Sequence, residues 1–134
     1  MKTAVDSSVL LTIFNGEPAG RSWLKCLVDA RREGPLVICD VVYAELAPAF
    51  GSENDFEDTL EKLGVVFEAS LSKACWQAGH AFRLYRTAGG PREHLIPDFL
   101  IAAHAMTQAD RLAAIDRGYL RRYFLDLLLL QPHR

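Results

Sequence analysis

The sequence has 134 residues, of which 50% are hydrophobic and 24% are charged, an ordinary balance for a globular protein that excludes a largely disordered chain. Because this length is close to the commonest size of one domain, we predict a single domain over residues 1–134. The formal charge of −2 is unusual for a nucleic-acid binder. Without four acidic residues considered below, however, the chain carries +2, so the net charge does not exclude RNA.

Neither a membrane segment nor a secretion signal is predicted. No apolar run approaches the roughly 18 to 20 residues of a membrane span, and the first residues lack a signal-peptide pattern. The three cysteines are odd in number and form no C-x-x-C pair, which favours reduced thiols in the core over disulfides or a structural zinc site. We therefore expect a cytoplasmic protein without membrane contact.

Short apolar runs alternate along the chain with segments of helical periodicity. Strands are predicted at residues 3–5, 36–39, 65–67, 112–115 and 127–130. The first predicted helix follows Asp6 directly, and the second contains an apolar stripe from Trp23 to Val28 and ends near Gly34. The third runs from a cap at Asp40 to about Phe50, and the fourth spans about 54–63.

Two further helices precede the fourth predicted strand. The first is capped by Ser70 or Ser72, carries Trp76, Phe82 and Tyr85 among its apolar positions, and ends at Gly89. The second begins at Pro97 and is almost wholly apolar, so it should be buried.

The alternation of strands and helices predicts an α/β fold, with a short, largely parallel central sheet between two layers of helices. Ligands of such folds bind at the carboxyl ends of the strands. Residues that follow the predicted strands are therefore the candidates for a functional site.

Four acidic residues are predicted at this edge. Asp6 follows the first strand, Glu45 lies inside the helix after the second, Asp98 lies in the first turn of the apolar helix, and Asp116 follows the strand at 112–115. Each has a simpler explanation, as a helix-terminus acid, a turn residue or a solvent-exposed charge. Glu45 and Asp98, however, have mainly apolar neighbours in the sequence, and an acid in such surroundings usually has a partner.

A divalent cation would allow these carboxylates to share a pocket. Two carboxylates about 4 Å apart repel by roughly 4 kcal/mol at an effective dielectric constant near 20. Oxygen ligands select Mg²⁺ or Mn²⁺ over zinc or copper, and one or two such ions can activate a water that attacks a phosphodiester. The residues therefore predict metal-dependent phosphodiester hydrolysis, with Asp6, Glu45, Asp98 and Asp116 as catalytic and metal-binding residues.

Four segments carry a resemblance to a known family. They are AVDSS at residues 4–8, VYAEL at 42–46, IPDFLIAAHA at 96–105 and AIDRGY at 114–119. With this spacing, the chain resembles the PIN-domain nucleases, most closely the VapC-type toxins of bacterial and archaeal toxin–antitoxin modules. The resemblance spans essentially the whole chain, and the third segment is the most specific.

The resemblance implies a three-layer α/β/α PIN-like fold and a magnesium-dependent endoribonuclease. It further implies a homodimer that is silenced by a cognate antitoxin protein, whose C-terminal segment covers the acidic site. Asp6, Glu45 and Asp98 match the family's three central acids, and Asp116 matches the less constant fourth.

One position departs from the family pattern. Many members carry Ser or Thr two residues before the fourth acid, where this chain has Ala114. The missing hydroxyl bears on the detailed role of Asp116 more than on the activity. Ser7 and Ser8 are candidates either for hydrogen bonds to the acidic residues or for caps of the first helix.

Several arginines are candidates for holding the phosphates of the RNA backbone, with ordinary solvent-exposed charge as the alternative. They are Arg83, Arg86, Arg92, Arg117, Arg121 and Arg122. Aromatic residues near the C-terminus could stack on bases, but we expect core or dimer contacts instead. They are Tyr119, Tyr123 and Phe124. The four histidines show no metal-ligand spacing and are assigned no chemistry.

Two alternatives remain open. The first is a PIN-like fold that has lost catalysis and serves only as a binding module, against which the retention of all four acids argues. The second is an acid-pocket phosphotransfer domain. Ser8 stands where a haloacid-dehalogenase-like phosphatase needs its second aspartate, and no lysine follows Lys73 to serve a receiver domain.

Overall fold

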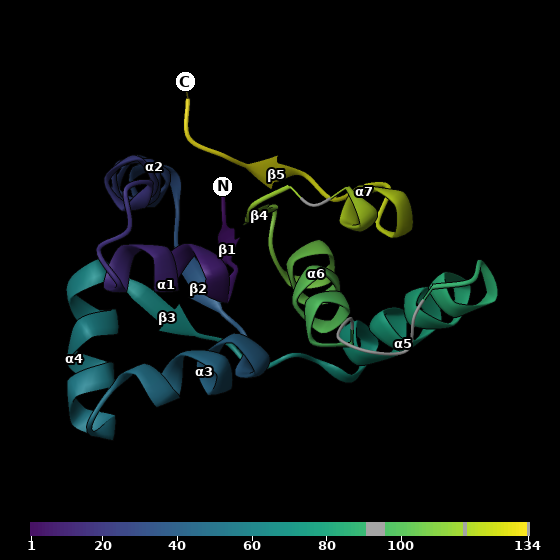
Figure 1. The fold of residues 1–134 in the computed structure, drawn as a ribbon, viewed down its shortest axis with the longest axis horizontal. Coiled ribbons are helices and arrows are strands. Elements are labelled where there is room, and N and C mark those ends of the chain that lie inside the picture. The colour runs from purple at the N-terminus through teal and green to yellow at the C-terminus, as the bar shows by residue number, and fades with distance from the viewer. Residues whose placement is uncertain (91–95, 117, 134) are drawn as a thin grey trace.

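A five-stranded parallel sheet forms the centre of the molecule (Figure 1). The computed structural model describes residues 1–90, 96–116 and 118–133. The strands are β1 (Thr3–Val5), β2 (Leu36–Ile38), β3 (Val65–Phe67), β4 (Arg111–Ala113) and β5 (Leu129–Leu130), in the order β3-β2-β1-β4-β5. Every strand pair is parallel. The predicted α/β class and the parallel sheet are confirmed.

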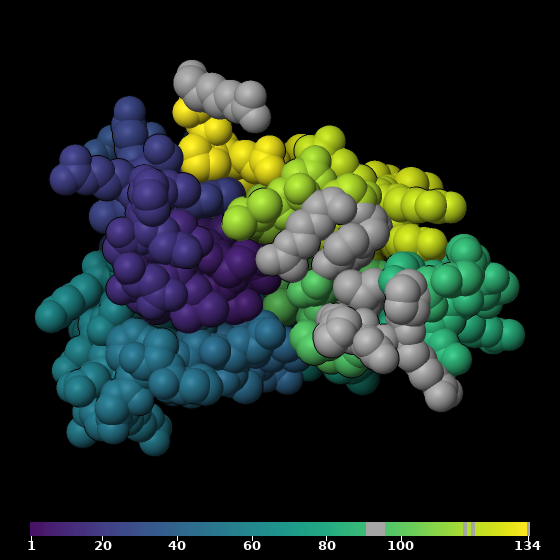
Figure 2. Space-filling model, in the orientation of Figure 1, coloured from purple at the N-terminus to yellow at the C-terminus, as the bar shows by residue number. Residues whose placement is uncertain are grey.

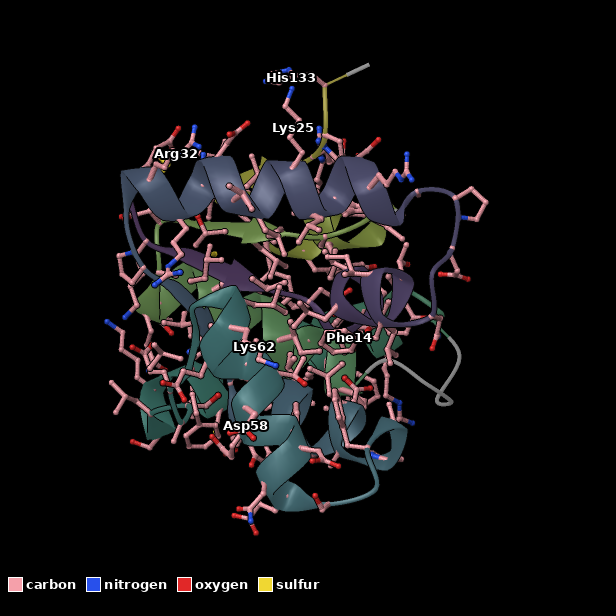
Figure 3. The ribbon with its side chains drawn as sticks, turned by 90° about the vertical axis from the view of Figure 1, so that its left-hand side faces the viewer. Phe14, Lys25, Arg32, Asp58, Lys62 and His133 are labelled. Carbon is pink, nitrogen blue, oxygen red and sulfur yellow. The ribbon has the colours of Figure 1, made fainter. Side chains whose placement is uncertain are left out.

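Helices cover both faces of this sheet. They are α1 (Ser7–Phe14), α2 (Gly20–Glu33), α3 (Asp40–Leu46), the 3₁₀ turn η1 (Ala47–Ala49), α4 (Glu53–Leu63), α5 (Ser72–Thr87), α6 (Ile96–Gln108) and α7 (Tyr119–Tyr123). Figure 1 shows α1, α2 and α4 on one side of the sheet and α5 and α6 on the other. Figure 3 faces the first layer, where Lys25 and Arg32 lie on α2 and Asp58 and Lys62 lie on α4. None of the helices in the described ranges is long and apolar enough to cross a membrane.

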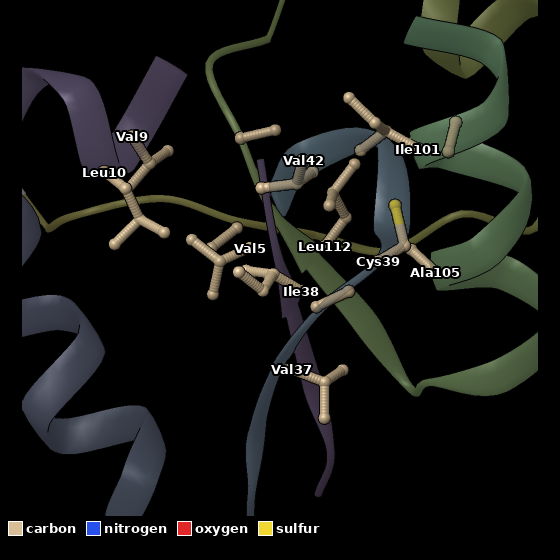
Figure 4. Packing of buried hydrophobic residues seen from close by; sticks show 14 of the residues in the cluster. Val5, Val9, Leu10, Val37, Ile38, Cys39, Val42, Ile101, Ala105 and Leu112 are labelled. Atoms are coloured by element: carbon tan, nitrogen blue, oxygen red, sulfur yellow. The ribbon is translucent and has the colours of Figure 1, made fainter. Parts of the chain in front are cut away.

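The core forms where the strands meet α1, α3 and α6. Val5, Ile38 and Leu112, one from each central strand, are fully buried and lie close to Val42 and Ile101 (Figure 4). As its apolar sequence predicts, α6 is buried along most of its length. Its small residues allow the helix to lie close to the sheet, because alanine side chains keep the backbones near one another.

Two predicted caps are wrong, and a third helix end is shifted. Asp40 is the first residue of α3 rather than its cap, and its Oδ1 instead accepts a hydrogen bond of 3.0 Å from the Ser70 amide. The cap position of α5 is Leu71, so neither Ser70 nor Ser72 caps that helix with its side chain. The α3 helix ends at Leu46, before the 3₁₀ turn that contains Pro48, because proline has no amide hydrogen to continue the helical bonds.

The C-terminal third differs more from the sequence-based expectation. The strand predicted at 112–115 is shifted to Arg111–Ala113, and the last strand is limited to two residues. A short helix, α7, was not predicted, because its five residues are too few to show a periodicity. Cys75, expected in the core, and Trp76, assigned to the apolar positions of this helix, are both exposed on α5.

A partly buried polar network connects Glu68, the residue after β3, to α6. The His104 side chain is 1% exposed, and its Nε2 lies 3.0 Å from Oε1 of Glu68. The second oxygen of Glu68 pairs with the ammonium of Lys2, and the side-chain amide of Gln108 donates a hydrogen bond of 3.3 Å to Oε1. The network therefore joins the N-terminus, the edge of the sheet and the α6 helix.

Burial lowers the pKa of His104 below its ordinary value of 6.5, and the facing Glu68 carboxylate only partly opposes this effect. Burial also acts to raise the pKa of Glu68, but the Lys2 ammonium and then His104 hold that pKa below its ordinary value. Because an ionised carboxylate can only accept, a neutral imidazole donates its Nε2 hydrogen to Glu68.

This network predicts a pH dependence of stability. As the pH falls below about 6.5, His104 takes up a proton more readily in the unfolded chain than in the folded one, so the free energy of unfolding should fall. Urea denaturation of the His104→Gln variant should show a flatter dependence between about pH 7.5 and 5.5. Replacement of the exposed His133 by Gln should leave the parent's dependence unchanged, and an equal slope in both variants would contradict the assignment.

Candidate active site at the carboxyl edge of the sheet

Asp6 is fixed at the carboxyl end of β1, at the centre of the sheet. Its amide donates a hydrogen bond of 2.9 Å to the Ala113 carbonyl at the end of β4, which prolongs the ladder by one residue. The Asp6 residue is 8% exposed. Its backbone is extended, whereas the next residue begins α1, so the strand-to-helix turn itself places this carboxylate at the edge of the sheet.

The two serines after Asp6 bind carboxylates with their side chains. Ser8 Oγ donates a hydrogen bond of 2.5 Å to Asp6 Oδ2, and Ser7 Oγ donates one of 2.9 Å to Glu45 Oε1. Neither hydroxyl caps α1, which has no side-chain cap bond. The alternative left open by the sequence is therefore decided in favour of hydrogen bonds to the acidic residues. The Ser7 contact also shows that Asp6 and Glu45 belong to one region, although 38 residues separate Ser7 from Glu45.

Asp98 lies in the first turn of α6 and is half-buried. Two residues, Ala109 and Asp110, separate this helix from β4, so α6 runs back along the sheet and its first turn lies toward the carboxyl ends of the strands. The α6 helix also contacts β1 and α3, the elements next to Asp6 and Glu45. The first turn of a helix favours a carboxylate, because the helix dipole is positive there.

Asp116 is held by its own turn. The Gly118 amide donates a hydrogen bond of 2.9 Å to Asp116 Oδ1, and Arg121 Nε lies 3.2 Å from Oδ2. Both oxygens therefore have protein partners, which is the arrangement of a turn aspartate. Gly118 has a φ of 83°, a backbone conformation that glycine adopts without strain.

The acidic residues do not form a closed cage. Within residues 1–90, 96–116 and 118–133, no three His, Cys, Asp or Glu side chains are grouped so that they could hold a metal ion together. An open set of oxygen ligands still fits Mg²⁺, which usually binds to one or two carboxylates and completes its shell with water and substrate phosphate. The donor set of Asp6, Glu45 and Asp98 contains only carboxylate oxygens and has no soft ligand that would favour zinc or copper.

The predicted arginines divide into three groups. Arg121 contacts an acidic site residue, and Arg122 lies over the Tyr123 ring at 5.6 Å. Arg83 and Arg86 are exposed on α5. Arg92 and Arg117 lie outside the described residues.

The aromatic residues near the C-terminus form core contacts. Phe124 meets Phe99 edge-on at 5.5 Å, and Tyr123 lies 5.9 Å from the same ring. Both thus pack against the residue that follows Asp98, and α7 supports the start of α6. The Tyr119 side chain lies outside the described part of the chain.

One contact near the site was not predicted from the sequence, and for a second the sequence left the partner open. The pairing of Arg121 with Asp116 depends on the α7 helix, which the sequence analysis missed. The bond from Ser7 to Glu45 is a long-range contact, for which the only local signal is a serine beside a predicted site acid.

Comparison with known proteins identifies the family. The family model described as "PIN domain" matches residues 3–125, a range that contains all four acidic residues. The chain belongs to the PIN-domain family. This confirms the resemblance found in the sequence and leaves no support for the phosphotransfer alternative.

Individual relatives of this PIN-domain chain agree. Ribonuclease VapC10 of Mycobacterium tuberculosis is 33% identical over 115 residues, which cover 84% of this chain and 80% of the relative. The fold is similar to that in the structure of VapBC2 from Rickettsia felis bound to a promoter DNA fragment, with a TM-score of 0.72 and 17% identity. That match covers 96% of this chain and 97% of the other. It is also similar to VapBC-1 from nontypeable Haemophilus influenzae, with a TM-score of 0.68, 21% identity and 96% of each chain covered. At these identities, the two structures bear on the fold alone.

Proposed function

We propose that this PIN-domain chain is a metal-dependent endoribonuclease that acts as the toxin of a toxin–antitoxin pair. The observation that carries the proposal is the pair of serine bonds, from Ser8 to Asp6 and from Ser7 to Glu45. They orient two carboxylates from distant segments at the edge of the sheet where α/β folds bind ligands. The name of the 33% identical relative, Ribonuclease VapC10, supports RNA as the substrate.

The proposed reaction is hydrolysis of an RNA phosphodiester bond, in which water adds across a phosphorus–oxygen bond and leaves one phosphate end and one hydroxyl end. When bound, Mg²⁺ or Mn²⁺ would lower the pKa of the attacking water and neutralise the charge that develops on the phosphate. Asp6, Glu45 and Asp98 would bind the cation together, one or two of them directly and the others through its water ligands. Ser7 and Ser8 would restrict the carboxylate orientations, as partners of metal ligands do in other proteins.

Asp116 is the fourth proposed carboxylate. One of its oxygens accepts a hydrogen bond from the Gly118 amide, and the other pairs with Arg121. Asp116 would therefore position the Arg121 guanidinium beside the site, and it would bind the cation only with its remaining lone pairs. A guanidinium in that place can bind a substrate phosphate through its planar pair of donors. The absence of a hydroxyl at Ala114 fits this positioning role.

We further propose a cognate antitoxin as the protein partner, a homodimer as the assembly and the cytoplasm as the location. A hollow of about 440 Å³ between α2 and α4 offers apolar side chains, among them Leu24 and Val28, beside the cations Arg31, Arg32 and Lys62. An amphipathic segment with acidic residues would complement this surface. The similar structures VapBC2 and VapBC-1 support such a partner.

The catalytic assignment predicts loss of cleavage in the Asp98→Asn variant. Loss of one carboxylate ligand should reduce the cleavage rate roughly a hundredfold or more, while the protein stays folded. Cleavage of a pool of cellular RNA would be measured with Mg²⁺, with Mn²⁺ and with EDTA, together with the melting temperature. The control is Asp58→Asn on the exposed surface of α4, which should cleave like the parent.

Two outcomes of that assay would contradict the proposal. If Asp98→Asn cleaved as fast as the parent, Asp98 would not be a metal ligand. If the folded parent cleaved nothing with either cation, the chain would instead be a binding module that has lost catalysis.

The serine bonds predict a smaller effect at Ser7. Ser7→Ala removes the hydrogen bond that Ser7 donates to Glu45, so the affinity for Mn²⁺ should fall roughly tenfold to a hundredfold. Titration calorimetry of the metal with the full chain measures this directly. Ser22→Ala, on the exposed side of α2, should bind Mn²⁺ like the parent, and an unchanged affinity in Ser7→Ala would rule out an orienting role for that hydroxyl.

A further inference from the structure

The outer face of α5 combines aromatic and positively charged residues and lacks acidic ones. From Ser72 to Thr87, the helix contains three cations, Lys73, Arg83 and Arg86, and no aspartate or glutamate. In a chain whose net charge is −2, this is a local excess of positive charge. Figures 1 and 2 show α5, in teal, along one outer side of the molecule.

Helical spacing aligns these residues. Lys73, Trp76, His80, Arg83 and Thr87 follow one another at intervals of three or four residues and are all exposed, so they form one stripe along α5, here called the α5 stripe. The opposite side of the helix is formed by Ala74, Ala78 and Ala81, which are buried. The stripe is therefore the solvent side of an amphipathic helix, and its aromatic residues do not belong to the buried side that packs on the core.

Trp76 and His80 form a stacked aromatic pair within the α5 stripe. Their ring centroids lie 5.1 Å apart with an angle of 8° between the planes. Trp76 is nonetheless 65% exposed, so most of its apolar surface remains in water. Flat exposed aromatic rings are the surfaces on which unpaired nucleobases stack, because every base offers a π-face.

A shallow hollow of about 400 Å³ lies beside the α5 stripe. It is lined by Gly79, Phe82, Arg83, Arg86 and Thr87. A side chain at Gly79 would meet no atom within 4 Å, so the helix surface is open next to Trp76. In the part of the chain that the structure describes, no carboxylate forms an ion pair with Arg83 or Arg86. Two guanidinium groups beside a hollow can bind phosphate.

The C-terminal end of α5 lies close to the turn that contains Asp98. Tyr85, near the C-terminal end of α5, packs edge-on against Phe99 at 5.6 Å, and Phe99 follows Asp98 in the sequence. The N-terminal end of α5 lies instead beside the end of α6, where the Leu71 amide donates to the side chain of Gln108. A strand laid along α5 from Arg86 to Trp76 would thus extend away from Asp98.

We propose that the α5 stripe and the adjacent Arg86 bind single-stranded RNA next to the cleavage site, with a base stacked on Trp76 and backbone phosphates on Lys73, Arg83 and Arg86. The choice of RNA rests on the nuclease function proposed above. A second copy of this chain fits the surface less well, because a two-fold contact through the stripe would bring its cations against one another. An acidic protein segment would match the charge but would leave the exposed ring pair without stacking partners.

Tryptophan fluorescence provides a direct test, because the chain has only two tryptophans and Trp23 is 5% exposed. The full chain is titrated in EDTA, without cleavage, with a 12-nucleotide single-stranded RNA and, separately, with a poly-glutamate peptide. RNA should quench the emission of the parent, whereas the peptide should not. Trp76→Phe should retain binding, followed by anisotropy of labelled RNA, but lose the quenching signal.

Affinity measurements complete this test. Trp76→Ala should weaken RNA binding at least about fivefold, as expected for the loss of one stacked base. Val66→Ala, at an exposed position on β3, is the matched control and should bind like the parent. RNA affinity should fall as the salt concentration rises. In the double variant Lys73→Gln/Arg83→Gln, this fall should be less steep, with the slope of log affinity against log salt smaller in magnitude by roughly 0.7 for each lost phosphate contact. The same double change at the exposed Arg21 and Lys25 of α2 should leave this slope unchanged.

Several results would overturn the proposal. They are RNA binding that leaves the emission of Trp76 unchanged, equal quenching by poly-glutamate, and a Trp76→Ala variant that binds RNA like the parent. A change in sedimentation of Trp76→Ala with unchanged RNA affinity would assign the stripe to a contact between copies. Because the nuclease function is tested separately by Asp98→Asn cleavage, each proposal can fail while the other stands.

Discussion

The parallel pairing of β1 with both β2 and β4 is the constraint on which the rest of the structure depends. It places the ends of three strands side by side, and the bond from the Asp6 amide to the Ala113 carbonyl fixes the last step of this alignment. A shift of β1 by one residue would exchange the two faces of the strand and bury Asp6 in the core. The position of the acidic edge is therefore as well determined as the core itself.

The sequence-based predictions were most accurate for the segments that are buried. The strands at 3–5 and 65–67 and the buried α6 were predicted closely, because strong apolar patterns report the core. The starts of α3 and α5 were predicted at the wrong residues. The Ser70 amide donates a hydrogen bond to the Asp40 carboxylate, and neither residue caps the helix that it was predicted to cap. Such a contact depends on the packed fold, and no local sequence signal records it.

The candidate site shows the same division. The positions of the acidic residues at strand and helix ends were predictable, because strand ends at one edge of a parallel sheet are brought together by topology. The partners in their hydrogen bonds were not, since Ser7 bonds to Glu45, 38 positions away, and Arg121 reaches Asp116 from an unpredicted helix. Sequence reasoning thus locates the carboxylates, whereas the structure shows which groups orient them.

Net charge describes this molecule poorly, because its charges are segregated by sheet topology. Asp6 and Glu45 are oriented at the carboxyl edge, while α5 carries three cations and no acidic residue. The two regions are adjacent because α5 and α6 pack against each other over their length, and Phe99 connects Tyr85 of α5 to the turn that contains Asp98. A polyanion approaching the acidic edge would meet repulsion there in the absence of a cation, and attraction along α5. If α5 binds RNA as proposed, the substrate would be held on the helix and would reach the carboxylates only where a cation compensates their charge.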